Sequence, residues 1–107
     1  MKVITVNYST KPEYAERNIS NIKSVMKDLL QAAHPGTAYH VCLGEDGRSF
    51  THTAFFKSLA DRQLLNELPS FKQFQQELQS GGLENPPRQE FPVLVGSTNE
   101  IWNSWAS

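Results

Sequence analysis

Residues 37 to 57, TAYHVCLGEDGRSFTHTAFFK, are the stretch that decides the fold of this chain. Two β-rich runs, at 37–43 and 49–57, flank a short segment that contains two glycines. β-Branched and aromatic residues favour strands, and glycine favours the backbone of a tight turn. The stretch therefore predicts a β-hairpin with a five-residue loop at 44–48.

The segment before the hairpin predicts a strand followed by a long helix. Residues 3 to 8 are β-rich, whereas apolar residues recur every three or four positions over 12–33. That spacing gives a helix one apolar face. His34-Pro35-Gly36 should end the helix, because proline cannot continue it and glycine accommodates the turn that follows.

The segment after the hairpin predicts two shorter helices and a last strand. Ser58 has the side chain of a helix N-cap and precedes a leucine-rich stripe. Pro69 interrupts this stripe, so a second helix is expected over 70–79. Residues 89 to 96 predict the last strand. Pro92 restricts this strand to an edge or a bulge, since proline donates no hydrogen bond to a ladder.

The predicted order of elements is βαββαβ. This is the ferredoxin-like arrangement, an α+β fold in which one four-stranded antiparallel sheet carries both helices on one face. The other face of the sheet would then be uncovered. A second copy related by two-fold symmetry is the simplest cover, so the sequence predicts a homodimer that closes into an α+β barrel.

Composition indicates a small single-domain protein from a reducing compartment. The 107 residues match the usual size of one domain, and 10 Lys+Arg against 11 Asp+Glu give a net charge of −1. No basic excess points to nucleic acid, and no apolar run is long enough to span a membrane. The single Cys42 cannot form an internal disulfide, and the first residues lack the apolar core of a signal peptide. A cytoplasmic location is therefore expected.

Three short segments carry a resemblance to known proteins: Val3-Ile4-Thr5-Val6-Asn7, Ala54-Phe55-Phe56-Lys57-Ser58 and Leu68-Pro69-Ser70-Phe71-Lys72-Gln73-Phe74. Together with the order and length of the elements, they resemble the dimeric α+β barrel superfamily. Within it, the branch similar to antibiotic biosynthesis monooxygenases matches best. The likeness covers residues 1–98, which form the predicted domain, and leaves residues 99–107 as a C-terminal tail.

The resemblance implies a homodimer with one small-molecule cavity in each protomer. Activities of the superfamily include cofactor-free oxygenation of phenolic compounds, haem degradation and quinol oxidation. Haem-degrading members carry a Trp and a His on the second helix and an Asn on the first strand. Asn7 matches that Asn, but the helix expected after Ser58 has neither Trp nor His, and Phe56 stands where the monooxygenase branch often has Trp. The resemblance therefore implies a site without haem or another cofactor.

The five-residue loop would pair residues whose numbers sum to 92, which places His40 opposite His52. Side chains alternate between the two faces of a strand. The aliphatic side of the first strand, with Ile4 and Val6, belongs under the helices, and the other set faces the barrel interior. That set is Asn7, His40, Cys42, Phe50, His52 and Phe56. A register slip of one residue would reverse the assignment.

An aromatic cavity with a few polar groups has the composition of a small-molecule site. His40 or His52 would act as general base toward a phenol, because imidazole suits proton transfer near neutral pH. Asn7 would hold the resulting oxyanion. The remaining residues of the set, Cys42, Phe50 and Phe56, would line the substrate. The alternatives are two structural histidines or a metal site, for which two histidines supply too few ligands.

The sequence leaves two functions open. The first is a cofactor-independent monooxygenase or related oxidoreductase acting on a small apolar or aromatic molecule. The second is a non-catalytic ligand-binding or stress-response module built on the same barrel. Trp102 and Trp105 in the tail either pack against the partner or belong to a loosely ordered end.

Overall fold

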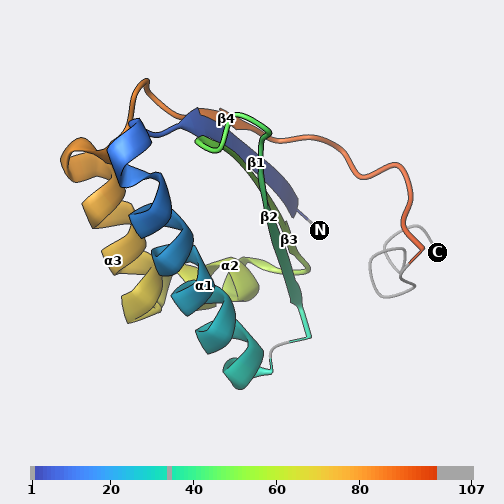
Figure 1. Ribbon diagram of the computed structural model, residues 1–107. Coiled ribbons are helices and arrows are strands. Elements are labelled where there is room, and N and C mark those ends of the chain that lie inside the picture. The colour runs from blue at the N-terminus through green and yellow to red at the C-terminus, as the bar shows by residue number, and fades with distance from the viewer. Residues whose placement is uncertain (1, 34, 99–107) are drawn as a thin grey trace.

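The computed structural model describes residues 2–33 and 35–98. Its elements are β1 (Lys2–Ser9), η1 (Pro12–Tyr14), α1 (Ala15–Ala32), β2 (Thr37–Leu43), β3 (Ser49–Phe56), α2 (Leu59–Glu67), α3 (Pro69–Glu77), η2 (Leu78–Gly82) and β4 (Arg88–Glu90). The strands form one antiparallel sheet in the order β2-β3-β1-β4, and the helices cover one of its faces (Figure 1). The predicted ferredoxin-like α+β fold is confirmed. His34 and the tail with Trp102 and Trp105 lie outside the described residues.

The break between α2 and α3 occurs where the sequence predicts it. Ser58 caps α2, because its hydroxyl accepts the Asp61 amide at 3.4 Å while the Asp61 carboxylate accepts the Ser58 amide at 2.7 Å. Leu68 is extended between the two helices, a conformation that proline favours in the residue before it. Pro69 lies in the first turn of α3, where a missing N–H removes no helical hydrogen bond.

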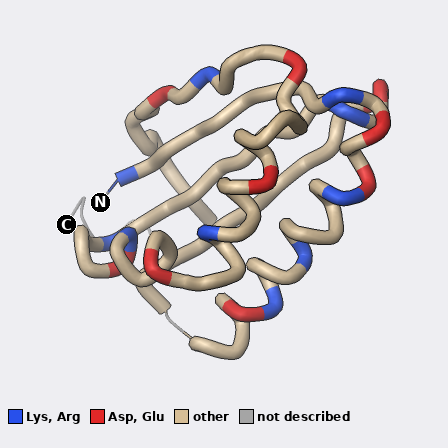
Figure 2. Tube along the Cα trace, turned by 90° about the vertical axis from the view of Figure 1, so that its left-hand side faces the viewer, with Lys and Arg blue, Asp and Glu red and all other residues tan. Residues whose placement is uncertain are grey.

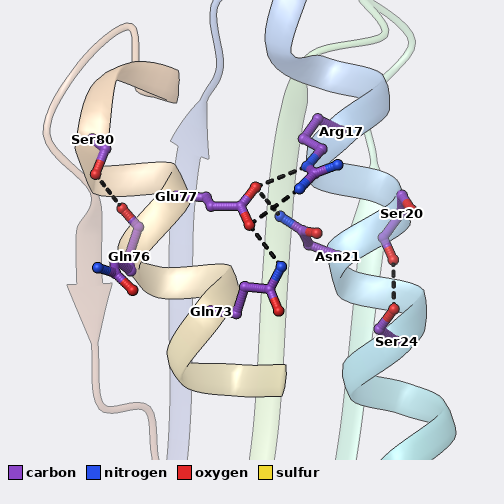
Figure 3. A network of polar contacts seen from close by, with 8 residues as sticks. All are labelled: Arg17, Ser20, Asn21, Ser24, Gln73, Gln76, Glu77 and Ser80. Carbon is purple, nitrogen blue, oxygen red and sulfur yellow. Dashed lines mark hydrogen bonds and ion pairs between the residues drawn. The ribbon is translucent and has the colours of Figure 1, made fainter. Parts of the chain in front are cut away.

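A cluster of polar side chains fastens α1 to α3. Glu77 accepts hydrogen bonds from Arg17 Nε at 2.8 Å, Asn21 Nδ2 at 3.2 Å and Gln73 Nε2 at 2.8 Å (Figure 3). The hydrogen bond from Arg17 is the main reason that the pKa of Glu77 falls to about 2. A second Arg17 donor also reaches the carboxylate, so its acceptor positions are occupied within the fold. The cluster therefore holds two helices together.

The hairpin register differs from the prediction by one residue. Val41, not His40, lies opposite His52, and paired residues sum to 93. The turn is the cause, because the Gly44 amide donates to the Ser49 carbonyl at 2.7 Å and draws both residues into the ladder. Only residues 45–48 then form the turn. Gly47 closes it with a φ of 75°, a left-handed backbone that glycine adopts without strain.

The one-residue difference moves three predicted site residues to the helix-covered face of the sheet. Phe50, His52 and Phe56 are core residues with 2%, 4% and 2% of their surface exposed, so their assignment to the open face is wrong. The other three lie on the open face as predicted: Asn7, His40 and Cys42. The predicted pairing of the two histidines is lost, because they now face opposite sides of the sheet.

The last strand is shorter than the predicted 89–96. β4 ends at Glu90, and the following residues leave the sheet on the side away from the helices (Figure 1). Pro92 has no N–H to extend the ladder. Three apolar side chains in this segment are exposed: Phe91 by 56%, with Lys2 Nζ 5.3 Å from its ring centroid, Val93 by 83% and Val95 by 96%.

Gly82 lies where the chain returns from α3 to the end of β1. An added Cβ would lie 2.5 Å from the nearest carbon of the Tyr14 ring. We expect Gly82→Ala to lower the free energy of unfolding by about 1–3 kcal/mol in urea denaturation, because the ring and backbone must move apart. Gly96→Ala is the control, since its Cβ meets no atom within 4 Å. Equal losses in both variants would contradict the steric explanation.

Candidate functional site

A groove runs between α1 and the edge strand β2. It consists of two adjoining hollows of about 380 and 500 Å³ that share Met26, Tyr39 and His40 in their walls. The other wall residues are mainly apolar and include Ile19, Ile22, Leu29, Leu30, Val41 and Phe50. A concave apolar surface with few polar groups is typical of small-molecule sites. We call it the α1–β2 groove.

A chain of buried polar side chains ends at this groove. Asn18 Nδ2 donates to the Tyr8 hydroxyl at 2.9 Å, and that hydroxyl lies 2.7 Å from His52 Nε2. The Tyr39 hydroxyl lies 2.6 Å from His52 Nδ1. Tyr39 also lines both hollows of the groove. We call these four residues the Tyr–His chain, which connects the inner side of α1 to the groove wall.

Strand register positions the Tyr–His chain. His52 pairs with Val6 on β1 and with Val41 on β2. Tyr8 and Tyr39 are each two residues from these partners, so both lie diagonally across from His52 on the same face of the sheet. Phe74 of α3 covers the imidazole, with ring centroids 5.5 Å apart. The helices thus cover the polar side chain of His52, which lies on the inner face of the sheet.

Burial keeps the Tyr–His chain uncharged at neutral pH. Desolvation lowers the pKa of His52 to about 4, because the charged imidazolium loses its water. Desolvation also raises the pKa of Tyr8 and of Tyr39 above that of an ordinary phenol. The chain can therefore orient hydrogen bonds, but His52 is too weak a base to deprotonate a phenol efficiently.

The structure brings only part of the predicted site together. Three of the six residues border the groove: His40, Cys42 and Phe50. Of these, Phe50 faces the helices, whereas the side chains of His40 and Cys42 lie on the open face of edge strand β2. His52 reaches the groove only through Tyr39. Asn7 lies on β1, where its Oδ1 accepts a hydrogen bond from Thr51 at 2.9 Å. Phe56 lines a separate hollow of about 190 Å³.

Three members of the Tyr–His chain were not predicted as site residues. Tyr8 and Tyr39 lie on the helix-facing side of their strands, where aromatic side chains are expected to belong to the hydrophobic core. A buried phenol needs a hydrogen-bond partner, and with the correct register His52 is that partner. Asn18 is a polar residue on the buried face of α1, between Ala15 and Ile22. A polar residue in an apolar stripe was therefore the available signal.

The strand side of the groove carries no charged residues. β2 and β3 contain no Lys, Arg, Asp or Glu, and such residues lie mainly on helices and loops (Figure 2). Within residues 2–33 and 35–98, no three His, Cys, Asp or Glu side chains are arranged to hold a metal ion. In the same residues, no helix combines the length and apolar character needed to cross a membrane. The uncharged strand wall suits an apolar ligand.

No protein-family model matches the sequence, and no curated protein matches it. Among solved structures, the chain is similar to a provisional antibiotic biosynthesis monooxygenase from Bacteroides thetaiotaomicron, with TM-score 0.77 and 12% identity over 92% of each chain. A second provisional antibiotic biosynthesis monooxygenase, from Nitrosomonas europaea, has TM-score 0.76 and 14% identity over 90% of this chain and 100% of that chain. A protein of unknown function from Nitrosomonas europaea has TM-score 0.69 and 22% identity over 92% of each chain. The chain therefore has the fold of antibiotic-biosynthesis-monooxygenase-like proteins, as the resemblance in its sequence implies.

Proposed function

We propose that this chain binds a small, mostly apolar or aromatic molecule in the α1–β2 groove and oxidises it without a cofactor. The position of Tyr39 carries this proposal, because its side chain lines both hollows while its hydroxyl contacts buried His52. A ligand in the groove would contact apolar walls and the Tyr39 hydroxyl, whose position is fixed by its hydrogen bond with His52. This combination provides both affinity and orientation.

The proposed reaction is oxygenation of a phenol by molecular oxygen. His40 lies on edge strand β2 beside the groove and is exposed, but its ring is on the open face of the sheet, with its centroid 6.3 Å from that of Phe55. We assign it as the general base that removes the phenolic proton after its side chain turns over the strand edge toward the groove. The electron-rich anion then reduces O2. One oxygen atom enters the ring to give a quinone, and the other leaves as water. The monooxygenase names of the structural neighbours suit this reaction class, although their low identity supports the fold alone.

Two predicted roles change in this proposal. His52 acts through Tyr39, because both of its ring nitrogens are within hydrogen-bond distance of a tyrosine hydroxyl. Asn7 is not among the residues that line the groove, so the hydroxyl of Tyr39 replaces it as the group that contacts the oxyanion. The lowered pKa of His52 favours the second candidate function, a binding module without catalysis.

The proposed assembly is a homodimer. Phe91, Val93 and Val95 alternate along the extended segment that follows β4, and all three are exposed. If this segment pairs as a strand, alternation would place these three side chains on one side of it. A second copy of the chain would remove this apolar surface from water.

We expect 1-naphthol to bind in the groove and to be converted to 1,4-naphthoquinone under air. His40→Ala should lower turnover by about 10²–10⁴-fold while affinity changes little, because it removes the base and keeps the apolar walls. Turnover is measured by quinone absorbance, and affinity by NMR shifts of the groove residues. Binding without turnover in the unmodified protein would favour the binding module.

Met26→Trp tests the location of the site. Met26 lies in the wall that both hollows share, so the larger side chain should fill the groove and lower affinity by about 10-fold or more. Ser24→Trp is the control, because Ser24 is exposed on the same helix and does not line either hollow. Unchanged affinity in Met26→Trp would place the ligand elsewhere.

A further inference from the structure

Hydrogen-bond directions in the Tyr–His chain follow from its donors. A tyrosine hydroxyl and a neutral imidazole each have one hydrogen to donate. Asn18 Nδ2 donates to the Tyr8 oxygen, which leaves the Tyr8 hydrogen for His52 Nε2. The one hydrogen of His52 then lies on Nδ1 and is donated to the Tyr39 oxygen.

The opposite direction of hydrogen-bond donation is unfavourable because it leaves buried N–H donors without acceptors. If His52 Nε2 donated to Tyr8, the Tyr8 hydrogen would need Asn18 Oδ1, and the amide would have to turn over. Its two N–H hydrogens would then lose the contact with Tyr8. In the observed orientation, Asn18 Oδ1 is the one side-chain N or O atom of the Tyr–His chain that has no hydrogen-bond partner among the described residues. Asn18 is fully buried, and an unpaired carbonyl is tolerated there more readily than an unpaired N–H.

The favoured direction leaves one hydrogen at the groove. Tyr39 accepts from His52, so its own hydroxyl hydrogen has no acceptor among residues 2–33 and 35–98. Tyr39 lines both hollows, and a molecule in the groove is therefore the available acceptor. The buried end of the Tyr–His chain is satisfied by Asn18, and a ligand in the groove would satisfy the open end.

We infer that Asn18 is a positioning residue that sets the direction of the Tyr–His chain, that Tyr39 donates its hydrogen into the groove, and that the ligand carries an acceptor oxygen. The carbonyl of an aromatic ketone or quinone and the oxygen of a phenolate are such acceptors. This inference rests on the proposed function of the groove. It makes an apolar site selective for oxygenated aromatic molecules.

The tautomer of His52 tests the direction without any ligand. Long-range ¹H–¹⁵N NMR of the unmodified protein at pH 8 should show the hydrogen on Nδ1. Asn18→Asp should move it to Nε2 at a pH high enough to ionise the buried carboxyl, because a carboxylate only accepts and would take the Tyr8 hydrogen. The spectra of this variant are therefore recorded from pH 8 upward until the carboxyl signal shows ionisation. Asn21→Leu is the control, since Asn21 lies on the same helix but bonds to Glu77. Hydrogen on Nε2 in the unmodified protein, or no change in Asn18→Asp, would overturn the inference.

A matched pair of probes tests the acceptor requirement. 1-Tetralone has a carbonyl that tetralin lacks, and the two molecules are otherwise alike. We expect 1-tetralone to bind about 3- to 10-fold more tightly, the usual net effect of one neutral hydrogen bond. Tyr39→Phe should abolish this preference, and so should Asn18→Asp, because Tyr39 would then donate to His52. If Asn18→Asp does not fold, the inference is still tested by the probe preference of Tyr39→Phe and by the His52 tautomer of the unmodified protein.

The outcomes separate this inference from the proposed function. Equal affinity for the two probes in the unmodified protein, with both bound in the groove, overturns the inference and leaves the groove as a binding site. Failure of both probes to bind overturns the proposed function and, with it, the requirement for an acceptor on the ligand. The His52 tautomer still tests the direction of the hydrogen bonds in the Tyr–His chain.

Discussion

Acidification from pH 7 to pH 4 should lower the free energy of unfolding by about 3 kcal/mol through His52 alone. The imidazole has a pKa of about 4 in the folded protein against 6.5 for an exposed histidine, because burial disfavours its charged form. Between these two pKa values, His52 is therefore protonated in the unfolded chain but largely neutral in the folded protein. The stabilising effect is complete above pH 6.5 and is lost as the pH falls from 6.5 toward 4.

Chemical denaturation at several pH values measures this effect. The carboxylates of Asp46 and Glu77 both have a pKa of about 2, so their stabilising effects are lost below about pH 4. The slope between pH 6.5 and 4.5 is thus mainly that of His52. His52→Gln should flatten it, whereas His40→Gln, on the exposed side of β2, should leave it unchanged. A flat profile in the unmodified protein would mean that water reaches His52.

The order of the elements is predictable from the sequence because each has a strong local signal. The period of the apolar residues marks α1, and Ser58 and Pro69 mark the limits of α2. The register of the hairpin has no such signal, because Gly44 is equally compatible with a loop and with a ladder. One hydrogen bond from Gly44 to Ser49 decides between them.

The candidate site was predicted less well because it depends on that register. A slip of one residue exchanges the two faces of a strand, so His52 moves from the predicted cavity to the core. His40 and Cys42 keep their predicted place on the open face and reach the groove only at its rim, along edge strand β2. The Tyr–His chain joins residues from three strands and one helix, and no local pattern contains it. The polar Asn18 within the buried stripe of α1 was its only trace in the sequence.

The period-two pattern of the last predicted strand is present, but its partner is not within the described chain. Phe91, Val93 and Val95 alternate as a half-buried strand would, yet β4 ends at Glu90. The open face of the sheet beside it is rich in threonine rather than in large apolar residues. The proposed partner copy is therefore supported more by this exposed segment than by the open face, where the sequence had placed the interface.

Replacing Phe91 with Ser and Val95 with Lys together should weaken the proposed homodimer by about 1,000-fold or more. Burial of each such side chain is worth about 1.5–3 kcal/mol, and two of them in each protomer are lost. The protein should sediment as a dimer of 12.1 kDa chains at about 50 µM, and the double variant as a monomer.

Folding of the monomer should survive this double substitution, because both side chains are already exposed within it. The circular dichroism spectrum and the unfolding midpoint at low concentration should therefore stay unchanged. Leu59→Ser is the control, since Leu59 is 70% exposed at the start of α2 and lies outside the extended segment. A dimer that persists in the double variant would move the interface away from residues 91–98. A monomer in the unmodified protein at this concentration would mean that the exposed apolar segment does not drive self-association.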